Sequence, residues 1–146
     1  MKISGGYQMN AARTDIFERL VDPDAIGGCL PGVEKLDKIG DNEYAMAMNI
    51  GIGPVKGTYN GKVTLLNINA PDSYQLQVEG SGRPGFVKGL GTVRLEDAGG
   101  STKISYEGDV EVGGPVGAVA QRMLGGVANR IVGQFFDCMQ KQIVGS

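Results

Sequence analysis

Residues 116–146 read VGAVAQRMLGGVANRIVGQFFDCMQKQIVGS, and this stretch decides the fold. Its apolar residues recur at spacings of three and four, which is typical of a helix with one buried face. They are Val116, Val119, Ala120, Met123, Leu124, Val127, Ala128, Ile131, Val132, Phe135, Phe136, Met139 and Ile143. Because Pro115 suits the first helical position, the pattern predicts a helix from Pro115 to Ile143, roughly 43 Å long at about 1.5 Å per residue.

Most of the chain before this helix is typical of β-strands. The predicted strands are a first one ending at Asn10, then 34–39, 43–52, 55–68, 74–79, 86–96 and 102–112. In the last strand, apolar or small residues alternate with charged or polar ones from Thr102 to Val112. Such alternation indicates a sheet with one face on the core and one face in water.

Two short helices are predicted between the first and second strands. Asn10 is a good N-cap for a helix over Ala11–Val21, and Asp22 with Pro23 is typical of the start of a second helix that ends at Gly27-Gly28. The element order predicts an α+β fold with a seven-stranded curved antiparallel sheet around the long C-terminal helix, as one domain over residues 1–146. Short turns favour a meander, because consecutive strands usually pair.

Composition excludes several classes of protein. The net charge of −2, without a dense Lys/Arg cluster, argues against nucleic-acid binding. No apolar stretch of signal-peptide length is present at the N-terminus, and Arg122, Arg130 and Asp137 interrupt the C-terminal helix as a membrane span. Cys29 and Cys138 are far apart in the chain and are expected to be reduced thiols. These observations predict a cytoplasmic protein.

Glycine is unusually abundant, with 25 residues, and several glycines fall inside the predicted strands. Those at apparent inward positions are Gly57, Gly61, Gly89, Gly91 and Gly108. One interpretation is that they let the strands bend or the helix approach closely. The other is that they leave a void for an apolar ligand. Both interpretations remain open at this point.

Signals for catalysis are weak. The chain has no histidine, which excludes Ser-His-Asp and Cys-His pairs and imidazole metal ligands, and Cys29 with Cys138 cannot form a zinc site alone. Residues 80–85, GSGRPG, have the spacing of a dinucleotide-binding loop, but the next residues alternate like a strand, so a hairpin turn is predicted. Almost no titratable side chain besides tyrosine falls on an inward position, which disfavours acid–base catalysis.

Two irregular motifs do not follow the alternation of apolar and polar residues that is typical of strands. They are Cys29-Leu30-Pro31-Gly32-Val33-Glu34 and residues 53–61, GPVKGTYNG. Together with the element order, they make the chain similar to the carbon monoxide dehydrogenase G-subunit family. This family is a branch of the helix-grip superfamily, which includes START and plant allergen-like domains, and the resemblance covers nearly the whole chain.

The resemblance implies a cavity-forming accessory protein that binds a hydrophobic small molecule, with no covalent cofactor and no metal. A quinone or a lipid is the expected ligand. The implied partner is a molybdenum-dependent carbon monoxide dehydrogenase or a related oxidoreductase, with peripheral contact at the inner face of the cell membrane. The residues expected to line the cavity are Cys29, Leu30, Met46, Met48, Tyr59, Leu76, Phe86, Leu90, Tyr106, Met123, Val127, Ile131 and Phe135.

Two rival functions stay open on the sequence alone. The first is an enzyme of the same fold, such as a cyclase, a dehydratase or a hydrolase. The second is a structural adaptor with a fully packed interior. The individual residues also have more than one interpretation. The tyrosines and methionines are either core or ligand contacts. Cys29 is a reactive thiol, a ligand contact at the mouth of a cavity, or a small buried residue at the end of a helix.

Overall fold

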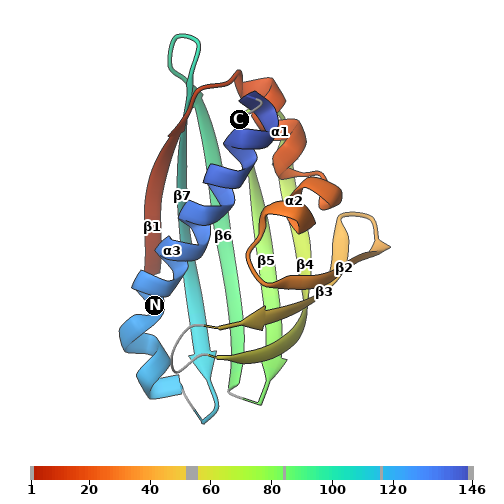
Figure 1. Cartoon of the computed structure of the whole chain (residues 1–146), viewed down its shortest axis with the longest axis vertical. Helices are drawn as coiled ribbons and strands as arrows, with labels where there is room; N and C mark the ends of the chain where they lie inside the picture. The colour runs from red at the N-terminus through yellow and green to blue at the C-terminus, as the bar shows by residue number, and fades with distance from the viewer. Residues whose placement is uncertain (1, 52–55, 84, 116, 145–146) are drawn as a thin grey trace.

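The computed structural model describes residues 2–51, 56–83, 85–115 and 117–144, with backbone alone at 118–121, 123–125, 127 and 144. Figure 1 shows the elements in space. In chain order they are β1 (Lys2–Met9), α1 (Arg13–Leu20), α2 (Pro23–Cys29), β2 (Val33–Gly40), β3 (Glu43–Ile50), β4 (Gly57–Asn69), β5 (Ser73–Gly82), β6 (Gly85–Asp97), β7 (Thr102–Gly113) and α3 (Gly117–Val144). The predicted α+β architecture is confirmed.

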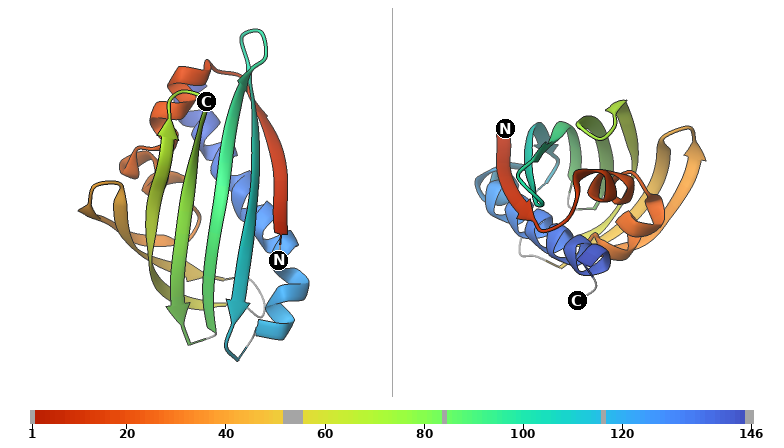
Figure 2. Two further views of the ribbon diagram at one scale, coloured as in Figure 1. Left: turned by 180° about the vertical axis from the view of Figure 1, so that it is seen from behind. Right: turned by 90° about the horizontal axis from the view of Figure 1, so that it is seen from above.

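The seven strands form one antiparallel sheet in the order β1-β7-β6-β5-β4-β3-β2. The sheet curves, and α3 crosses its open side (Figure 2). The predicted meander is correct for β2 to β7 but wrong for β1, which pairs with β7 instead of β2. The helices α1 and α2 separate β1 from β2 along the chain, and this longer connection lets β1 reach the opposite edge of the sheet.

The fully buried core lies at the end of the molecule that carries α1 and α2. There, Phe17 of α1 meets the edge of the Tyr74 ring at 5.7 Å between ring centroids. The C-terminal half of α3 supplies Phe136 and Met139 to the same core. The other buried apolar residues in this cluster are Met9, Ile16, Leu20, Ala25, Cys29, Tyr44, Leu65, Val93, Leu95 and Ile104. The core therefore closes one end of the space between sheet and helix.

The two short helices begin differently from each other. Asp22 caps α2 as predicted, since its Oδ1 accepts a hydrogen bond from the Asp24 N–H at 3.1 Å. The predicted Asn10 cap of α1 is wrong, because the N-cap is Ala12 and no side chain caps the helix. The Asn10 N–H donates instead to Oε1 of Gln140 in α3, at 3.2 Å. Asn10 therefore ties the end of β1 to the terminal helix.

Cys29 and Cys138 form a disulfide, so the prediction of two reduced thiols is wrong. Their Cα atoms are 5.4 Å apart although 109 positions separate them in the sequence. Packing of α2 against α3 brings them together, which spacing along the chain could not show. The interpretation of Cys29 as a buried residue is confirmed by its 6% exposure. The bond joins the last residue of α2 to the terminal helix.

A second link to α3 comes from Tyr7 of β1, whose hydroxyl donates to Oδ1 of Asp137. The Tyr7 ring also stacks on Phe136 with centroids 5.3 Å apart. Burial, the hydrogen bond to Asp137 and the negative charge of that carboxylate together raise the pKa of Tyr7 to about 12. The neutral phenol is thus the form that the fold stabilises.

The raised pKa of Tyr7 predicts a loss of stability at alkaline pH. An unfolded tyrosine releases its proton near pH 10, whereas folded Tyr7 does so near pH 12. Between these values the folded state binds more protons, so the free energy of unfolding falls as the pH rises. Urea unfolding between pH 9 and pH 12 should show a shallower fall for Tyr7→Phe than for the wild type. Equal slopes would contradict this assignment.

Candidate ligand-binding interior

The inner face of the sheet is made of residues that alternate with the exposed ones and point toward α3. Strand pairing aligns these residues in rows across the sheet. One row is Gly108, Gly91, Leu76 and Leu65; the next is Val110, Gly89, Val78, Val63 and Tyr44; a third is Val112, Val87, Gly80, Gly61 and Met46. The row after that pairs Met48 of β3 with Tyr59 of β4. Apolar groups and glycines therefore make up most of this face.

Exposure along the inner face changes from one end to the other. Toward α1 and α2, inward residues such as Leu95 and Ile104 are buried. Farther along the strands, Val112 near the end of β7 is buried, whereas most described inward residues are partly exposed although they face the interior. We call these residues the open half: Met46, Met48, Tyr59, Gly61, Val63, Leu76, Val78, Gly80, Val87, Gly89, Gly91, Tyr106, Gly108 and Val110. Each of these residues is intermediate in exposure, neither fully buried nor fully exposed.

The inward glycines have two different roles. A Cβ at Gly61 would overlap the carbonyl oxygen of Glu79, so a close approach between β4 and β5 requires glycine there. At Gly80, by contrast, the nearest atom to an added Cβ is the Asn60 oxygen at 3.9 Å. A Cβ at Gly91 would also have only ordinary contacts, the nearest at 3.5 Å. Close packing thus explains Gly61, whereas Gly80 and Gly91 leave room for a side chain, and the interpretation of the glycines as a ligand void stays a prediction.

The polar groups on the inner face are mainly phenols. The Tyr106 hydroxyl donates to Oδ1 of Asn129 in α3 at 2.9 Å, and a Cβ at Gly5 would overlap the Tyr106 ring. Burial raises the pKa of Tyr106 and of Tyr59. Both phenols are therefore neutral near pH 7. Tyr106 lies where the packed core meets the open half, and there it holds α3 to β7.

Charged side chains are absent from the inward positions of segments 44–50, 57–65, 74–80, 87–95 and 102–112. An ion placed against this surface would lose hydration without gaining a counter-charge, which is unfavourable. The described part of the chain also contains no cluster of three or more His, Cys, Asp or Glu side chains that could hold a metal ion. The chemistry of this face suits an uncharged apolar group.

The structure sorts the predicted cavity residues into several groups. Met46, Met48, Tyr59, Leu76 and Tyr106 all face the interior and belong to the open half. On α3, Ile131 and Phe135 are half-buried, and Phe135 packs against the core. The predicted Met123 and Val127 lie outside the residues whose side chains are described. Leu30 is partly exposed just after α2, where its N–H donates to the Ile26 oxygen.

Three of the predicted cavity positions are corrected by the structure. Phe86 and Leu90 point to the outer face, because the buried Val93 and Leu95 fix the opposite alternation of β6. Their exposures are 37% and 48%. Cys29 belongs to the packed core and to the disulfide, and it does not line the open half. The sequence shows only that the two predictions for β6 exclude each other, since neighbouring residues such as Gly89 and Leu90 cannot both face inward in a regular strand.

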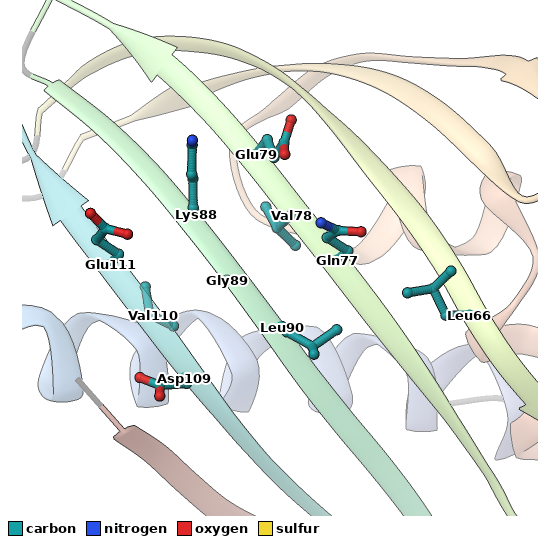
Figure 3. Close-up of a pocket in the computed structure, with 10 residues that line it drawn as sticks. All are labelled: Leu66, Gln77, Val78, Glu79, Lys88, Gly89, Leu90, Asp109, Val110 and Glu111. Carbon is teal, nitrogen blue, oxygen red and sulfur yellow. The ribbon is translucent and has the colours of Figure 1, made fainter.

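An open depression on the outer face of the sheet surrounds Leu90 (Figure 3). Its lining includes the charged side chains of Glu79, Lys88, Asp109 and Glu111. Strand pairing places Lys88 between Glu79 and Glu111, so opposite charges alternate across three strands. Such neighbours stabilise a sheet surface. This depression is charged and open to solvent, unlike the inner face, and it is a poor match for an apolar ligand.

Comparison with known structures supports the architecture. A conserved protein from Geobacillus kaustophilus is 35% identical, with a TM-score of 0.95, and the match covers 100% of this chain and 97% of that one. A START superfamily protein from Mycobacterium smegmatis is 14% identical, with a TM-score of 0.75 and coverage of 99% and 97%. Ara h 8.0201 is 12% identical, with a TM-score of 0.73 and coverage of 100% and 99%. The last two likenesses concern the fold alone.

Among the described residues, no helix is long and apolar enough to cross a membrane. No curated protein matches the sequence significantly. The model of the family described as the G subunit of carbon monoxide dehydrogenase (CoxG) matches residues 5–144. That range runs from the middle of β1 to the end of α3, and it agrees with the helix-grip architecture. The chain therefore belongs to the carbon monoxide dehydrogenase G-subunit family.

Proposed function

We propose that this protein is a non-catalytic accessory protein that shelters an uncharged apolar ligand between α3 and the open half of the sheet. One observation carries the proposal: Met46, Met48, Tyr59, Leu76 and Tyr106 face the interior and yet stay partly exposed. Apolar surface left in contact with water at the inside of a fold is available for a ligand to cover. Each square ångström covered contributes about 25 cal/mol, so about 200 Å² corresponds to roughly 5 kcal/mol.

The chemistry of the interior argues against catalysis. General acid–base catalysis near neutral pH needs a group whose pKa lies near the working pH. The charged side chains of β3 to β7 fall on the outer face or at strand ends, and burial moves the pKa values of Tyr59 and Tyr106 upward, away from neutrality. An accessory role also agrees with membership of a family named for one component of a dehydrogenase.

Within this proposal the partner is a molybdenum-dependent carbon monoxide dehydrogenase, and the ligand is a quinone or a lipid. Such a dehydrogenase must pass electrons to the respiratory chain, so a lipophilic quinone is a functional candidate. The inward positions that the structure describes on β3 to β7 offer no cation for a carboxylate or a phosphate, which favours a neutral head group over a charged one. We place the protein on the cytoplasmic side of the cell membrane, where it assists recruitment of the enzyme or its electron transfer.

The ligand can be identified directly. Purified protein would be extracted with organic solvent, and the extract analysed by mass spectrometry for quinones and lipids. The proposal predicts one prenylated quinone or lipid at close to one molecule per chain. Repeated empty extracts, together with no uptake of added quinone or phospholipid, would rule out the carrier role and favour a structural adaptor.

A further inference from the structure

The Cys29–Cys138 disulfide completes a series of contacts between the two edges of the sheet. Those edges are β1 and β2, the first and last strands in the sheet order. On one side, the Tyr7 hydroxyl of β1 donates a hydrogen bond to α3. The disulfide then joins α3 to α2, and α2 packs on β2, where a Cβ at Gly27 would lie 3.7 Å from the Leu36 side chain. We call this series, β1–α3–α2–β2, the clasp.

Within the clasp, α3 is held to the rest of the fold by more than the disulfide. Arg19 of α1 donates a hydrogen bond to Oε1 of Gln142 at 3.1 Å, and Tyr7 holds β1 to the same helix. The helix α2 has only seven residues, with Gly27 and Gly28 just before its last residue, and glycine weakens a helix. Without the disulfide, α3 therefore keeps its links to α1 and β1, and the end of α2 is the part that is released.

The two cysteines differ in their access to solvent. Cys29 is buried in the packed core. Cys138 is partly exposed, and its Sγ lies 3.7 Å from the Gly28 carbonyl oxygen, so a thiol at this position would have a hydrogen-bond acceptor within reach. Cys138 also lines an open depression on the surface of α3, together with Gln134, Asp137, Lys141 and Gln142. A thiol in solution therefore has access to the disulfide from the Cys138 side.

We infer that the Cys29–Cys138 disulfide is an exchange site for a cellular dithiol, and that its reduction opens the clasp at α2. The inference rests on the proposed function, because a protein on the cytoplasmic side of the membrane meets the reductants that keep thiols reduced there. Disulfides in that compartment are usually transient and serve catalysis or redox sensing. The bond is thus placed to respond to the redox state of its surroundings.

The exchange has two steps. In the first, a thiolate of the dithiol attacks Sγ of Cys138, the bond between the two cysteine sulfurs breaks, and Sγ of Cys29 leaves as a thiolate that takes up a proton. In the second, the other thiol of the dithiol attacks its own sulfur in the mixed disulfide and releases Cys138, which is protonated in turn. The dithiol loses two electrons and two protons and becomes a disulfide, and the two cysteines gain them.

Opening at α2 would uncover the interior beside the open half. Leu36, which lies next to Gly27 of α2, pairs with Met46 across β2 and β3. Met46 is one of the inward, partly exposed residues of the open half. Movement of α2 away from Leu36 would therefore give solvent a path to Met46. A ligand between α3 and the open half should leave the reduced protein faster than the oxidised one.

Glutathione, a monothiol, tests the exchange site. The full chain in its oxidised form would react with glutathione, and N-ethylmaleimide would trap the cysteine that is set free. Peptide mass spectrometry should find glutathione on Cys138 about tenfold more often than on Cys29, because exchange needs access to the attacked sulfur. In urea-unfolded protein both cysteines should react equally. Glutathione mainly on Cys29 of the folded protein, or none on either, would overturn the inference.

Hydrogen exchange tests the clasp without any ligand. Reduction with dithiothreitol should make the amides of α2 exchange about tenfold faster at short labelling times, because the end of the helix is no longer cross-linked. The amides of β5 and β6 should stay protected at those times. The variant with Cys29→Ala and Cys138→Ala is the matched control, and its α2 should exchange like that of the reduced wild type. Unchanged protection of α2 on reduction, or loss of protection in β5 and β6 as well, would contradict a clasp that opens locally.

Release of a quinone connects the clasp to the proposed function. Protein loaded with a short-chain ubiquinone would be mixed with excess phosphatidylcholine vesicles, and the quinone left on the protein followed over time. The reduced wild type should release it about tenfold faster than the oxidised form, which corresponds to a barrier lower by about 1.4 kcal/mol. Dithiothreitol should not change the rate for the double alanine variant, which also controls for reduction of the quinone itself.

The outcomes separate the clasp from the carrier role. Equal release from the oxidised and the reduced wild type would show that the disulfide does not control the ligand. No uptake of the quinone in either redox state would contradict the carrier role alone, because the glutathione and hydrogen-exchange experiments need no ligand.

Discussion

Replacing Cys29 and Cys138 together by alanine should lower the free energy of unfolding by about 3 to 5 kcal/mol. The disulfide closes a loop of 109 positions, and a cross-link across a loop of about 100 residues is worth roughly 4.7 kcal/mol in the chain-entropy model. Cys29 is also buried, at 6% exposure, so its truncation leaves space in the core. Urea unfolding of the oxidised wild type and of the double variant measures the difference.

The single variants Cys29→Ala and Cys138→Ala supply the control for this prediction. Each removes the cross-link, so each should lose most of the stability that the double variant loses. The wild type in a dithiol reductant should also approach the stability of the double variant. The account of the disulfide would be wrong if the purified wild type, without reductant, carried two titratable thiols per chain.

Filling the open half should abolish most ligand binding. Gly80→Val with Gly91→Val would place two branched side chains on the inner face, where each added Cβ meets nothing closer than 3.5 Å. Overfilling of an enclosed space typically costs about 1 to 3 kcal/mol, which corresponds to roughly tenfold to a hundredfold weaker binding of a quinone. The free energy of unfolding should stay level or rise, because valine favours strands more than glycine does. Equilibrium uptake of a quinone, with urea unfolding in parallel, measures both.

Two control variants distinguish two causes of lost quinone binding: side chains that fill the open half, and a sheet that is destabilised. Ser81→Val is next to Gly80 on β5 but on the outer face, and it should leave quinone binding unchanged. Gly61→Ala should instead lower the stability, because its Cβ would overlap the Glu79 carbonyl oxygen. If the double valine variant binds the quinone as tightly as the wild type, the ligand does not lie over the open half.

Much of the fold could be predicted from the sequence, because it depends on local periodicity. The alternation from Thr102 to Val112 matches the buried and exposed faces of β7, and the three-and-four spacing after Pro115 matches α3. Asp22 and Pro23 start α2 as their chemistry predicts. In each case the information lies within a few neighbouring residues.

What the sequence could not provide depends on contacts between distant segments. The pairing of β1 with β7 and the bond between Cys29 and Cys138 both follow from packing of the helices across the sheet. The outward position of Leu90 needed the burial of Val93 as an anchor, since size and hydrophobicity alone suggested the interior.

The position of a bound ligand shows whether the open half is the binding site. A crystal structure of the protein loaded with a prenylated quinone would show it. We expect electron density for the quinone between α3 and the inner face, in contact with Met46, Tyr59 and Leu76. Electron density for the quinone over the outer depression at Leu90 would contradict binding in the interior. So would an interior filled by protein side chains alone, in protein shown to bind the quinone.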